Sequence, residues 1–340
     1  MENSEKSLRI RLSFFVSLRY TVGTDLFSEY GMDFTISASQ DGMLLRTYLF
    51  SVLHLSRRIV TQLKQTAFGI TLNQAPVTVR AIVHTGDRLS LALSDTAEDE
   101  NPQILPVDLP IEILYEDDWL YAVCKPAGMP THPTHGHYCD TLANALTYRN
   151  LCTGTPFCFR AVNRLDRNTS GIVLVAKHKL CACLMAKKMQ AGEMEKQYLA
   201  VVVGVPLQSE GIIDLPIRRA KESIILREVS DLADADPAKT RYRVLYVAPD
   251  NSYSILAVRP LTGRTHQIRV HFAAIGHPLM GDSLYGTASP LISRHALHAT
   301  SLRFTHPQNN SPVEVLAPPP PDLCEIWKGA WIWNAQYHNL

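Results

Sequence analysis

The stretch RAVNRLDRNTSGIVLVAK, residues 160–177, is the most informative part of the chain. Its second half contains GIVLVA, a continuous apolar run that predicts a buried strand. The polar loop before this run carries Arg164, Asp166 and Arg167. A carboxylate between two arginines and beside a buried strand is held ionised and oriented, as a nucleophilic carboxylate must be. Taken alone, the pattern favours a simpler interpretation, an arginine–aspartate clamp that only fixes the loop.

Two later segments add context to this loop. EKQYLAVVVG, residues 195–204, places Tyr198 at the entry to an apolar strand. Residues 253–282 predict a strand, a turn and a short amphipathic helix that ends at Gly276. Three basic side chains crowd the first turns of that helix: Arg264, His266 and Arg269. A buried arginine at this point could form a bidentate pair with a buried aspartate.

Residues 41–93 predict a compact basic unit upstream. MLLRTYLFSVL has helical spacing, and Ser56 is a suitable N-cap for a second helix, RRIVTQLKQ. Residues 76–93 predict two short strands joined through Thr-Gly-Asp. Three bases of the second helix can lie off its apolar face: Arg57, Arg58 and Lys64. Such a cluster suits either RNA phosphates or simply a solvated helix face.

Bulk composition narrows the class of protein. Of 340 residues, 46% are hydrophobic and 19% are charged, as in a folded globular protein. No apolar run approaches the roughly 18 residues of a membrane helix, and a secretory signal pattern is missing. The 7 cysteines are odd in number and form no C-x-x-C pair, which argues against disulfides and structural zinc. These features predict a cytoplasmic protein without a membrane partner.

Four further motifs accompany the 160–177 stretch. They are KPAG at 125–128, GRTHQIRVH at 263–271, GHPLMGD at 276–282 and RHALHATSLRFTHP at 294–307. In this order they resemble the RluA-type family of pseudouridine synthases over Ile111 to about Pro321. The family's H-R-L-D-x-x-T-S-G is matched by residues 163–171, although Asn163 replaces the usual histidine. Several long motifs in one order make a chance match very improbable.

The resemblance implies a role for each candidate residue. Asp166 corresponds to the aspartate that attacks the uridine, Tyr198 to the aromatic residue that stacks on the base, and Arg269 to the basic partner of the aspartate. The remaining bases are expected to contact RNA: Arg164, Arg167, Arg264 and His266 near the cleft, and Arg57, Arg58 and Lys64 upstream. No metal, cofactor or obligate protein partner is expected, because the base is only detached, rotated and rejoined.

The 41–93 unit resembles the alpha-L motif, an RNA-binding module shared by a small-subunit ribosomal protein and many RNA-modifying enzymes. We therefore expect an α+β protein, in which this helix-pair module precedes a catalytic domain with a bent, mostly antiparallel sheet. The expected segments are an extension (1–40), the module (41–93), an acidic linker (94–110), the catalytic domain (111–328) and a tail (329–340).

Other interpretations of the sequence are weaker. A catalytically silent RNA-binding or ribosome-assembly factor would be expected to lack Asp166, Tyr198 or Arg269, and a nucleosidase-like hydrolase would release free base. The GDSL tetrapeptide at 281–284 lies within another motif, and the histidines of THPTHGHY (131–138) have no ligand set around them. Large-subunit ribosomal RNA is the expected substrate, with transfer RNA second.

Overall fold

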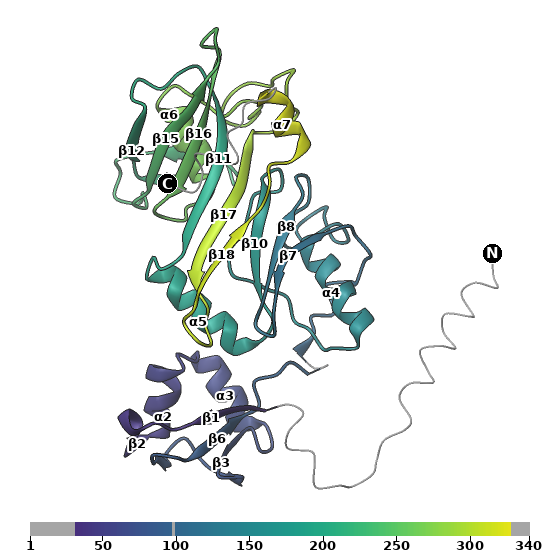
Figure 1. Ribbon diagram of the computed structural model, residues 1–340, viewed down its shortest axis with the longest axis vertical. Coiled ribbons are helices and arrows are strands. Elements are labelled where there is room, and N and C mark those ends of the chain that lie inside the picture. The colour runs from purple at the N-terminus through teal and green to yellow at the C-terminus, as the bar shows by residue number, and fades with distance from the viewer. Residues whose placement is uncertain (1–30, 97–98, 328–340) are drawn as a thin grey trace, which may run out of the picture.

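The computed structural model describes residues 31–96 and 99–327. Most of the predicted extension, and the predicted tail from residue 329, lie outside these ranges. The described chain forms two bodies, a small one coloured purple to blue and a larger, elongated one (Figure 1). Within the described ranges, no helix combines the length and the apolar character needed to cross a membrane.

The small body contains the predicted helix pair and two small sheets. One sheet has the strand order β1-β6-β3-β4, and the other pairs β2 with β5. Its elements are β1 Met32–Thr35, η1 Ala38–Gln40, β2 Met43–Leu44, α2 Leu45–Thr47, the π-helical turn η2 Tyr48–Val52, α3 Arg57–Gln65, β3 Ile70–Leu72, β4 Ala75–Pro76, β5 Ile82–Val83 and β6 Arg88–Leu91. The Ser56 hydroxyl accepts a hydrogen bond from the Ile59 amide at 3.3 Å, which confirms the predicted N-cap of α3.

The small body differs from the expectation at its start. It begins before residue 41, because β1 pairs along β6 and an Asp33–Arg88 ion pair joins the two strands. The four residues of β1, MDFT, are the shortest alternating run that indicates a strand, and no element was predicted for them. The two strands predicted within 76–93 are present as β5 and β6, joined through Thr-Gly-Asp as expected. β5 pairs with β2, and β6 pairs with β1 and β3.

The segment predicted as a linker, residues 94–110, is packed against the larger body. Asp95 accepts hydrogen bonds from both terminal nitrogens of Arg160, at 2.6 and 2.8 Å, and Ile104 is buried in the main core. The acidic composition indicated a solvated spacer. Composition alone could not show that Asp95 has a basic partner 65 residues away.

The larger body is built on a ten-stranded sheet in the order β12-β15-β16-β11-β17-β10-β8-β7, with β18 on β17 and β9 on β10. The strands are β7 Glu112–Glu116, β8 Leu120–Lys125, β9 Arg160–Ala161, β10 Ser170–Ala176, β11 Glu195–Val203, β12 Glu210–Asp214, β15 Lys239–Val247, β16 Tyr253–Pro260, β17 Leu297–Thr305 and β18 Pro312–Leu316; β13 Ile217–Arg219 and β14 Arg227–Val229 form a separate hairpin. All pairs are antiparallel except β10 with β17. The α+β class with a mostly antiparallel sheet is therefore confirmed.

Four helices pack around this sheet: α4 Leu142–Thr153, α5 Lys179–Gln190, α6 Gln267–Ala274 and α7 Pro321–Trp327. Leu146 of α4 and Phe272 of α6 share a buried cluster with Val173 of β10, so both helices cover one face. Met185 of α5 packs with Ile172, whose side chain points to the opposite face. α5 also contributes Leu180 to the core of the small body, and this contact joins the two bodies.

A glycine fixes the place where the two halves of the sheet meet. β10 and β17 pair only at Ser170–His298 and Gly171–Ala299. Gly171 has a φ of +111°, and a Cβ atom there would lie 2.1 Å from the carbonyl oxygen of Ala299. Only glycine accommodates this approach. The contact holds the end of the 164–170 loop at the centre of the sheet.

Candidate active site

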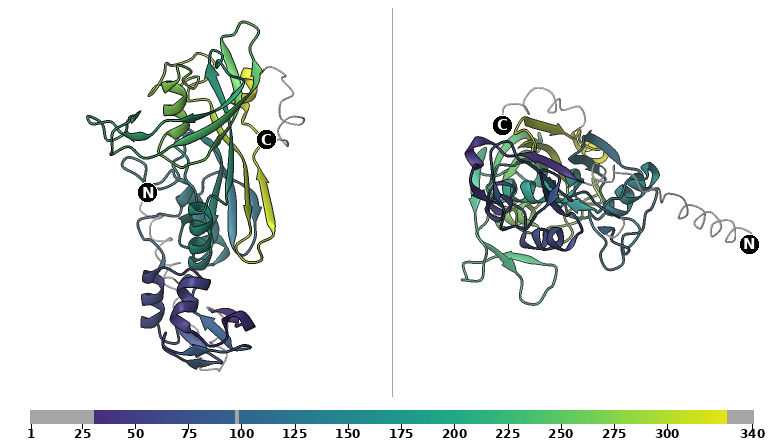
Figure 2. Two further views of the ribbon diagram at one scale, coloured as in Figure 1. Left: turned by 90° about the vertical axis from the view of Figure 1, so that its left-hand side faces the viewer. Right: turned by 90° about the horizontal axis from the view of Figure 1, so that it is seen from below.

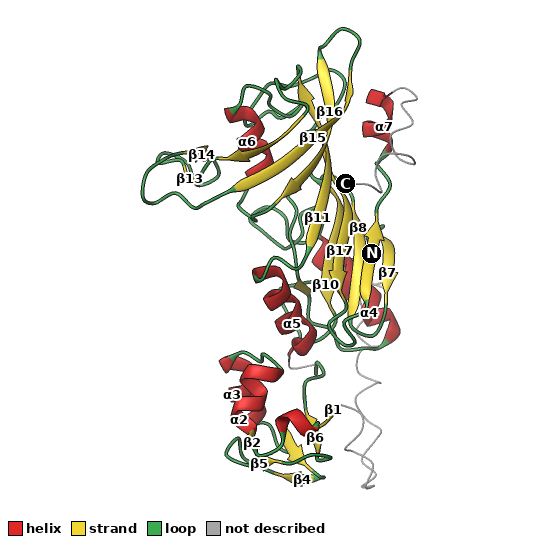
Figure 3. Cartoon of the chain, turned by 60° about the vertical axis from the view of Figure 1, so that its left-hand side comes forward, coloured by secondary structure: helices red, strands yellow, loops and turns green. Residues whose placement is uncertain are grey.

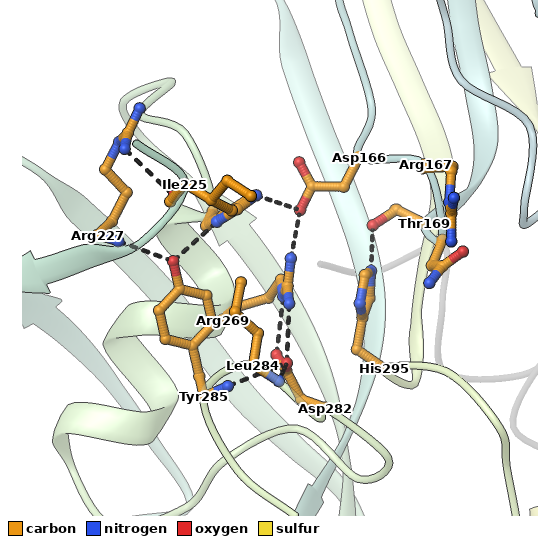
Figure 4. Close-up of polar contacts among 12 residues, drawn as sticks. Asp166, Arg167, Thr169, Ile225, Arg227, Arg269, Asp282, Leu284, Tyr285 and His295 are labelled. Atoms are coloured by element: carbon orange, nitrogen blue, oxygen red, sulfur yellow. Dashed lines mark hydrogen bonds and ion pairs between the residues drawn. The ribbon is translucent and has the colours of Figure 1, made fainter. Parts of the chain in front are cut away.

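Asp166 lies in the loop between β9 and β10, and its side chain faces α6 (Figure 4). Its backbone carbonyl accepts a hydrogen bond from the Thr169 amide at 3.0 Å. The Thr169 hydroxyl in turn lies 2.8 Å from Nε2 of His295. The Asp166 side chain keeps 28% of its surface exposed. The carboxylate is therefore held firmly by its loop but can still be reached from outside.

Arg269 of α6 joins Asp166 to a second carboxylate. Its Nη1 donates to Oδ2 of Asp166 at 3.1 Å, while Nε and Nη2 donate to the two oxygens of Asp282 at 2.7 and 2.8 Å. The expected bidentate pair is thus made with Asp282, and Asp166 receives a single hydrogen bond from Arg269. Asp282 is 1% exposed, and the backbone amides of Leu284 and Tyr285 also donate to its Oδ1, at 3.0 and 3.2 Å.

This arrangement engages only one of the two carboxylate oxygens of Asp166. Oδ2 of Asp166 has Arg269 as its hydrogen-bond donor, and within the described ranges Oδ1 has none. In Figure 4 this second oxygen points away from Arg269. One oxygen is thereby fixed by a cation, and the other is free to meet a substrate.

The electrostatics of the pair follow from burial and from the guanidinium. Burial alone would raise the pKa of Asp282, but the hydrogen bonds and charge of Arg269 outweigh it and hold that pKa below its usual value. Burial likewise disfavours the charged form of Arg269, yet its two carboxylate partners raise the pKa of the guanidinium overall. Arg269 and Asp282 therefore both stay charged at neutral pH.

His266 and Arg264 take different places at the start of α6. His266 adopts a left-handed φ of 56°, and its Nε2 lies 3.7 Å from Oδ2 of Asp166 while Nδ1 lies 2.8 Å from the Tyr285 hydroxyl. Burial lowers the pKa of His266, against the opposing pull of Asp166. Arg264 turns away, donating to the carbonyl of Pro237 at 3.1 Å. Of the two, only His266 belongs to the cluster around Asp166.

Tyr198 is presented by β11 on the face that α6 covers. It is 8% exposed and packs in the same buried cluster as Ile268 of α6. Burial, reinforced by the charge of Asp166, raises the pKa of its hydroxyl. Among the described residues no hydrogen-bond partner is present for this hydroxyl. Tyr198 is therefore a neutral phenol at physiological pH, with a donor still available.

Lys125, which was not among the predicted site residues, anchors the loop from behind. Its side chain is fully buried, and Nζ donates to the carbonyls of Pro126, Met129 and Arg167 at 2.9, 2.7 and 3.0 Å. Burial lowers the pKa of Lys125 to about 7. Three carbonyl acceptors match the three donors of the protonated amine. The KPAG motif was the available signal, because it sets this lysine beside a turn.

Asn163, at the position of the family histidine, faces the strand. Its side-chain amide donates to the carbonyl of Ile172 at 3.1 Å and accepts from the amide of Leu174 at 2.8 Å. It is 8% exposed. Both polar ends of this side chain are therefore used to hold the β10 backbone, and neither reaches Asp166.

The remaining predicted RNA contacts lie on the surface. Arg164 and Arg167 are exposed on the 164–170 loop, and Nη1 of Arg167 lies 2.8 Å from Nε2 of His137. His137 in turn lies 2.6 Å from Asp140, and the described ranges hold no cluster of side chains suited to a metal. Three bases are exposed on α3 of the small body: Arg57, Arg58 and Lys64. The structure thus separates a buried cluster around Asp166 from two sets of exposed bases.

Comparisons with known proteins agree with this geometry. Residues 120–274 match the family model for RNA pseudouridylate synthase. An uncharacterized RNA pseudouridine synthase, YhcT of Bacillus subtilis, is 34% identical over 293 residues, 86% of this chain and 95% of the relative. Ribosomal large subunit pseudouridine synthase D of Xylella fastidiosa is 36% identical over 272 residues, 76% of this chain and 80% of the relative. The structure of human RNA pseudouridylate synthase domain containing 1 aligns with a TM-score of 0.52 and 30% identity, covering 63% of this chain and 86% of that one.

Proposed function

Since this chain belongs to the RNA pseudouridine synthase family and is an RNA isomerase, we propose that its substrate is large-subunit ribosomal RNA. The name of its Xylella relative specifies that subunit, and the two chains align over most of their length. Transfer RNA is the second choice. The cytoplasm, where both RNAs are modified in bacteria, is the proposed location.

Asp166 is proposed as the residue that attacks the target uridine. The supporting observation is that Arg269 binds one oxygen of its carboxylate and leaves the other open. An ionised, oriented carboxylate can form a covalent bond to the nucleotide while the bond between the base nitrogen and the sugar breaks. Arg269 keeps the Asp166 carboxylate correctly turned. Asp282 keeps Arg269 in place.

Tyr198 is proposed to hold the detached base. The uridine must leave the RNA stack before its glycosidic bond can be reached, at a cost of a few kcal/mol, and stacking on an aromatic ring offsets part of that cost. The base then rotates, its carbon bonds to the sugar, and the covalent bond to Asp166 breaks, which frees the carboxylate; the proton on that carbon is released. The neutral Tyr198 hydroxyl, without a protein partner, suits a relay for this proton.

The bases outside the cleft are proposed to position the RNA. Arg164 and Arg167 flank Asp166 on the catalytic loop, where they can contact phosphates next to the flipped uridine. The small body, residues 32–93, is proposed as an alpha-L RNA-binding module that grips the backbone through Arg57, Arg58 and Lys64. Contacts of this kind add affinity without reading sequence.

The substrate is tested by mapping pseudouridine in unmodified RNA incubated with the purified protein. Transcripts of the large-subunit ribosomal RNA and of the complete transfer RNA set are offered separately. We expect new pseudouridine at defined positions of the large-subunit transcript. Modification confined to transfer RNA would contradict the proposed substrate while leaving the roles of Asp166, Tyr198 and Arg269 intact.

A further inference from the structure

We propose that a cavity on the face of the sheet opposite Tyr198 binds the phosphodiester backbone of the RNA substrate, away from the target uridine. This proposal rests on RNA being the substrate. The cavity has a volume of about 470 Å³ and is lined by strands β11, β12, β15, β16 and β17. Four arginines line it, and we call it the arginine pocket: Arg241, Arg243, Arg259 and Arg303.

The strand pairing places the arginine pocket behind the active site. Tyr198, Val258 and Tyr242 are cross-strand partners, and all three belong to the buried cluster that α6 covers. Side chains alternate along a strand, so Arg241, Arg243 and Arg259 point to the other face. Figure 3 shows α6 on one side of this part of the sheet and α7 on the other. A ligand in the pocket therefore cannot be the nucleotide that reacts with Asp166.

Two of the four arginines are already neutralised. Arg259 pairs with Glu195 at 2.7 Å, and Arg303 pairs with Glu314 at 2.8 Å. Among the described residues, Arg241 and Arg243 have no ion-pair partner and donate no side-chain hydrogen bond, although Glu210 of β12 is the cross-strand neighbour of Arg243. Arg243 is half-buried. A guanidinium that is partly withdrawn from water without an acceptor indicates a site for an anion.

RNA phosphates fit this pair of arginines. Arg241 and Arg243 are two residues apart on one strand, so their side chains leave the sheet about 6.6 Å from each other on the same face. Each planar guanidinium can hold a phosphate with two parallel hydrogen bonds. β12 is the edge strand of the sheet, and a long RNA can pass around this edge from the active-site face. The protein would then hold its substrate on both faces.

The test compares a long RNA with a short one. The probes are two fragments of one RNA that the wild-type protein modifies: the longest available fragment, and the shortest in which pseudouridine still forms. Any modified RNA can serve, so the test holds even if that RNA is not ribosomal. The variant is Arg241→Gln with Arg243→Gln. Neither residue touches the catalytic cluster, and unfolding in urea checks that the variant folds as the wild type does.

We expect the double variant to bind the long fragment about 10-fold more weakly at low salt. The slope of log affinity against log salt should fall by about 1.4 to 1.8, the value for two lost phosphates. Turnover and KM on the short fragment should stay unchanged. Glu210→Gln, which removes an acid from the same pocket, should act in the opposite direction and tighten binding of the long fragment.

Two results would overturn the proposal. One is that the double variant binds the long fragment with the same affinity and the same salt slope as the wild type. The other is an equal loss on the long and the short fragments, because this would assign the arginines to the active-site face.

Discussion

The cluster around Asp166 and the α3 surface of the small body both consist of charged residues, yet they are built in opposite ways. Around Asp166 the charges are paired at 2.7–3.1 Å and the side chains of Arg269 and Asp282 are 8% and 1% exposed. On α3, Arg57 and Arg58 stand in solvent, and neither has an ion-pair partner among the described residues.

This difference determines how each region responds to mutation. In a buried network the removal of one partner leaves another charge unpaired, at a cost of roughly 3–5 kcal/mol. On an exposed surface each charge acts almost independently and is screened by salt. Substitutions near Asp166 should therefore have large effects that depend on geometry, and substitutions on α3 should have small effects that add.

Arg269→Ala should have the largest effect among the supporting residues. The change leaves Asp282 buried without its guanidinium partner and frees Asp166 to rotate. We therefore expect turnover to fall by about 1,000-fold, the upper range for loss of one electrostatic contact. Arg269→Lys should recover part of the loss, because charge returns without the planar fork. Single-turnover kinetics measure both. Equal, near-normal rates for the two variants would show that the network is not needed.

Tyr198→Phe should have the next largest effect. The ring still stacks on the base, so RNA affinity should stay near the wild-type value. Loss of the hydroxyl should slow turnover by about 100-fold, the lower end for a proton-transfer group. The rate constant at saturating RNA is the quantity to measure. A wild-type rate would exclude the hydroxyl from the chemistry and leave Tyr198 as a platform only.

Acid should weaken the buried region through its neutral histidines. Burial lowers the pKa of His298 to about 4, and the side chain bonds to Ser170 and to the Ala317 carbonyl. His298 is therefore protonated less readily in the folded protein than in the unfolded chain. The contribution of neutral His298 to the free energy of unfolding is fully present above pH 6.5 and is lost as the pH falls towards 4.

The free energy of unfolding should fall when the pH is lowered from 7 to 5, and His298 should account for about 2 kcal/mol of that decrease. Urea unfolding at the two pH values measures the difference. His298→Gln should reduce it by about that amount, whereas His135→Gln, at an exposed position, should leave it unchanged. The same pH dependence in all three proteins would contradict this account of His298.

Substitution of the α3 bases should have the smallest effect. Arg57→Gln, Arg58→Gln and Lys64→Gln together should weaken RNA binding by about 10-fold and lower the salt slope by roughly 2 to 3, with turnover at saturating RNA unchanged. Arg88→Gln is the control in the same body, because Arg88 is already paired with Asp33. If the triple variant behaves like this control, α3 does not contact the RNA.

Local patterns in the sequence predicted the elements that carry the site. The apolar runs became β10 and β11, and the helix with Arg269 starts within a few residues of its expected position. The motifs also placed Asp166, Tyr198 and Arg269 in one site, and the structure brings these three together. Such features depend on neighbouring residues, which sequence patterns describe well.

The partners of these residues depend on the tertiary fold and were not predicted. Asp282 as the bidentate partner of Arg269, and Lys125 beneath the catalytic loop, lie in recognised motifs, but a motif does not show which side chain meets which. The Asp95–Arg160 pair and strand β1 were also missed, because both depend on contacts between segments more than 50 residues apart.

The most direct test of this account is pseudouridine formation by Asp166→Asn. Asparagine keeps the shape of the side chain but cannot act as a nucleophile. Wild type and variant are compared on the same unmodified RNA, with RNA affinity and urea unfolding measured alongside. We expect no detectable pseudouridine from the variant, with RNA affinity and fold retained. Pseudouridine formation by a clean Asp166→Asn preparation would contradict the assignment of Asp166 as the attacking residue. It would also contradict the supporting role given to Arg269.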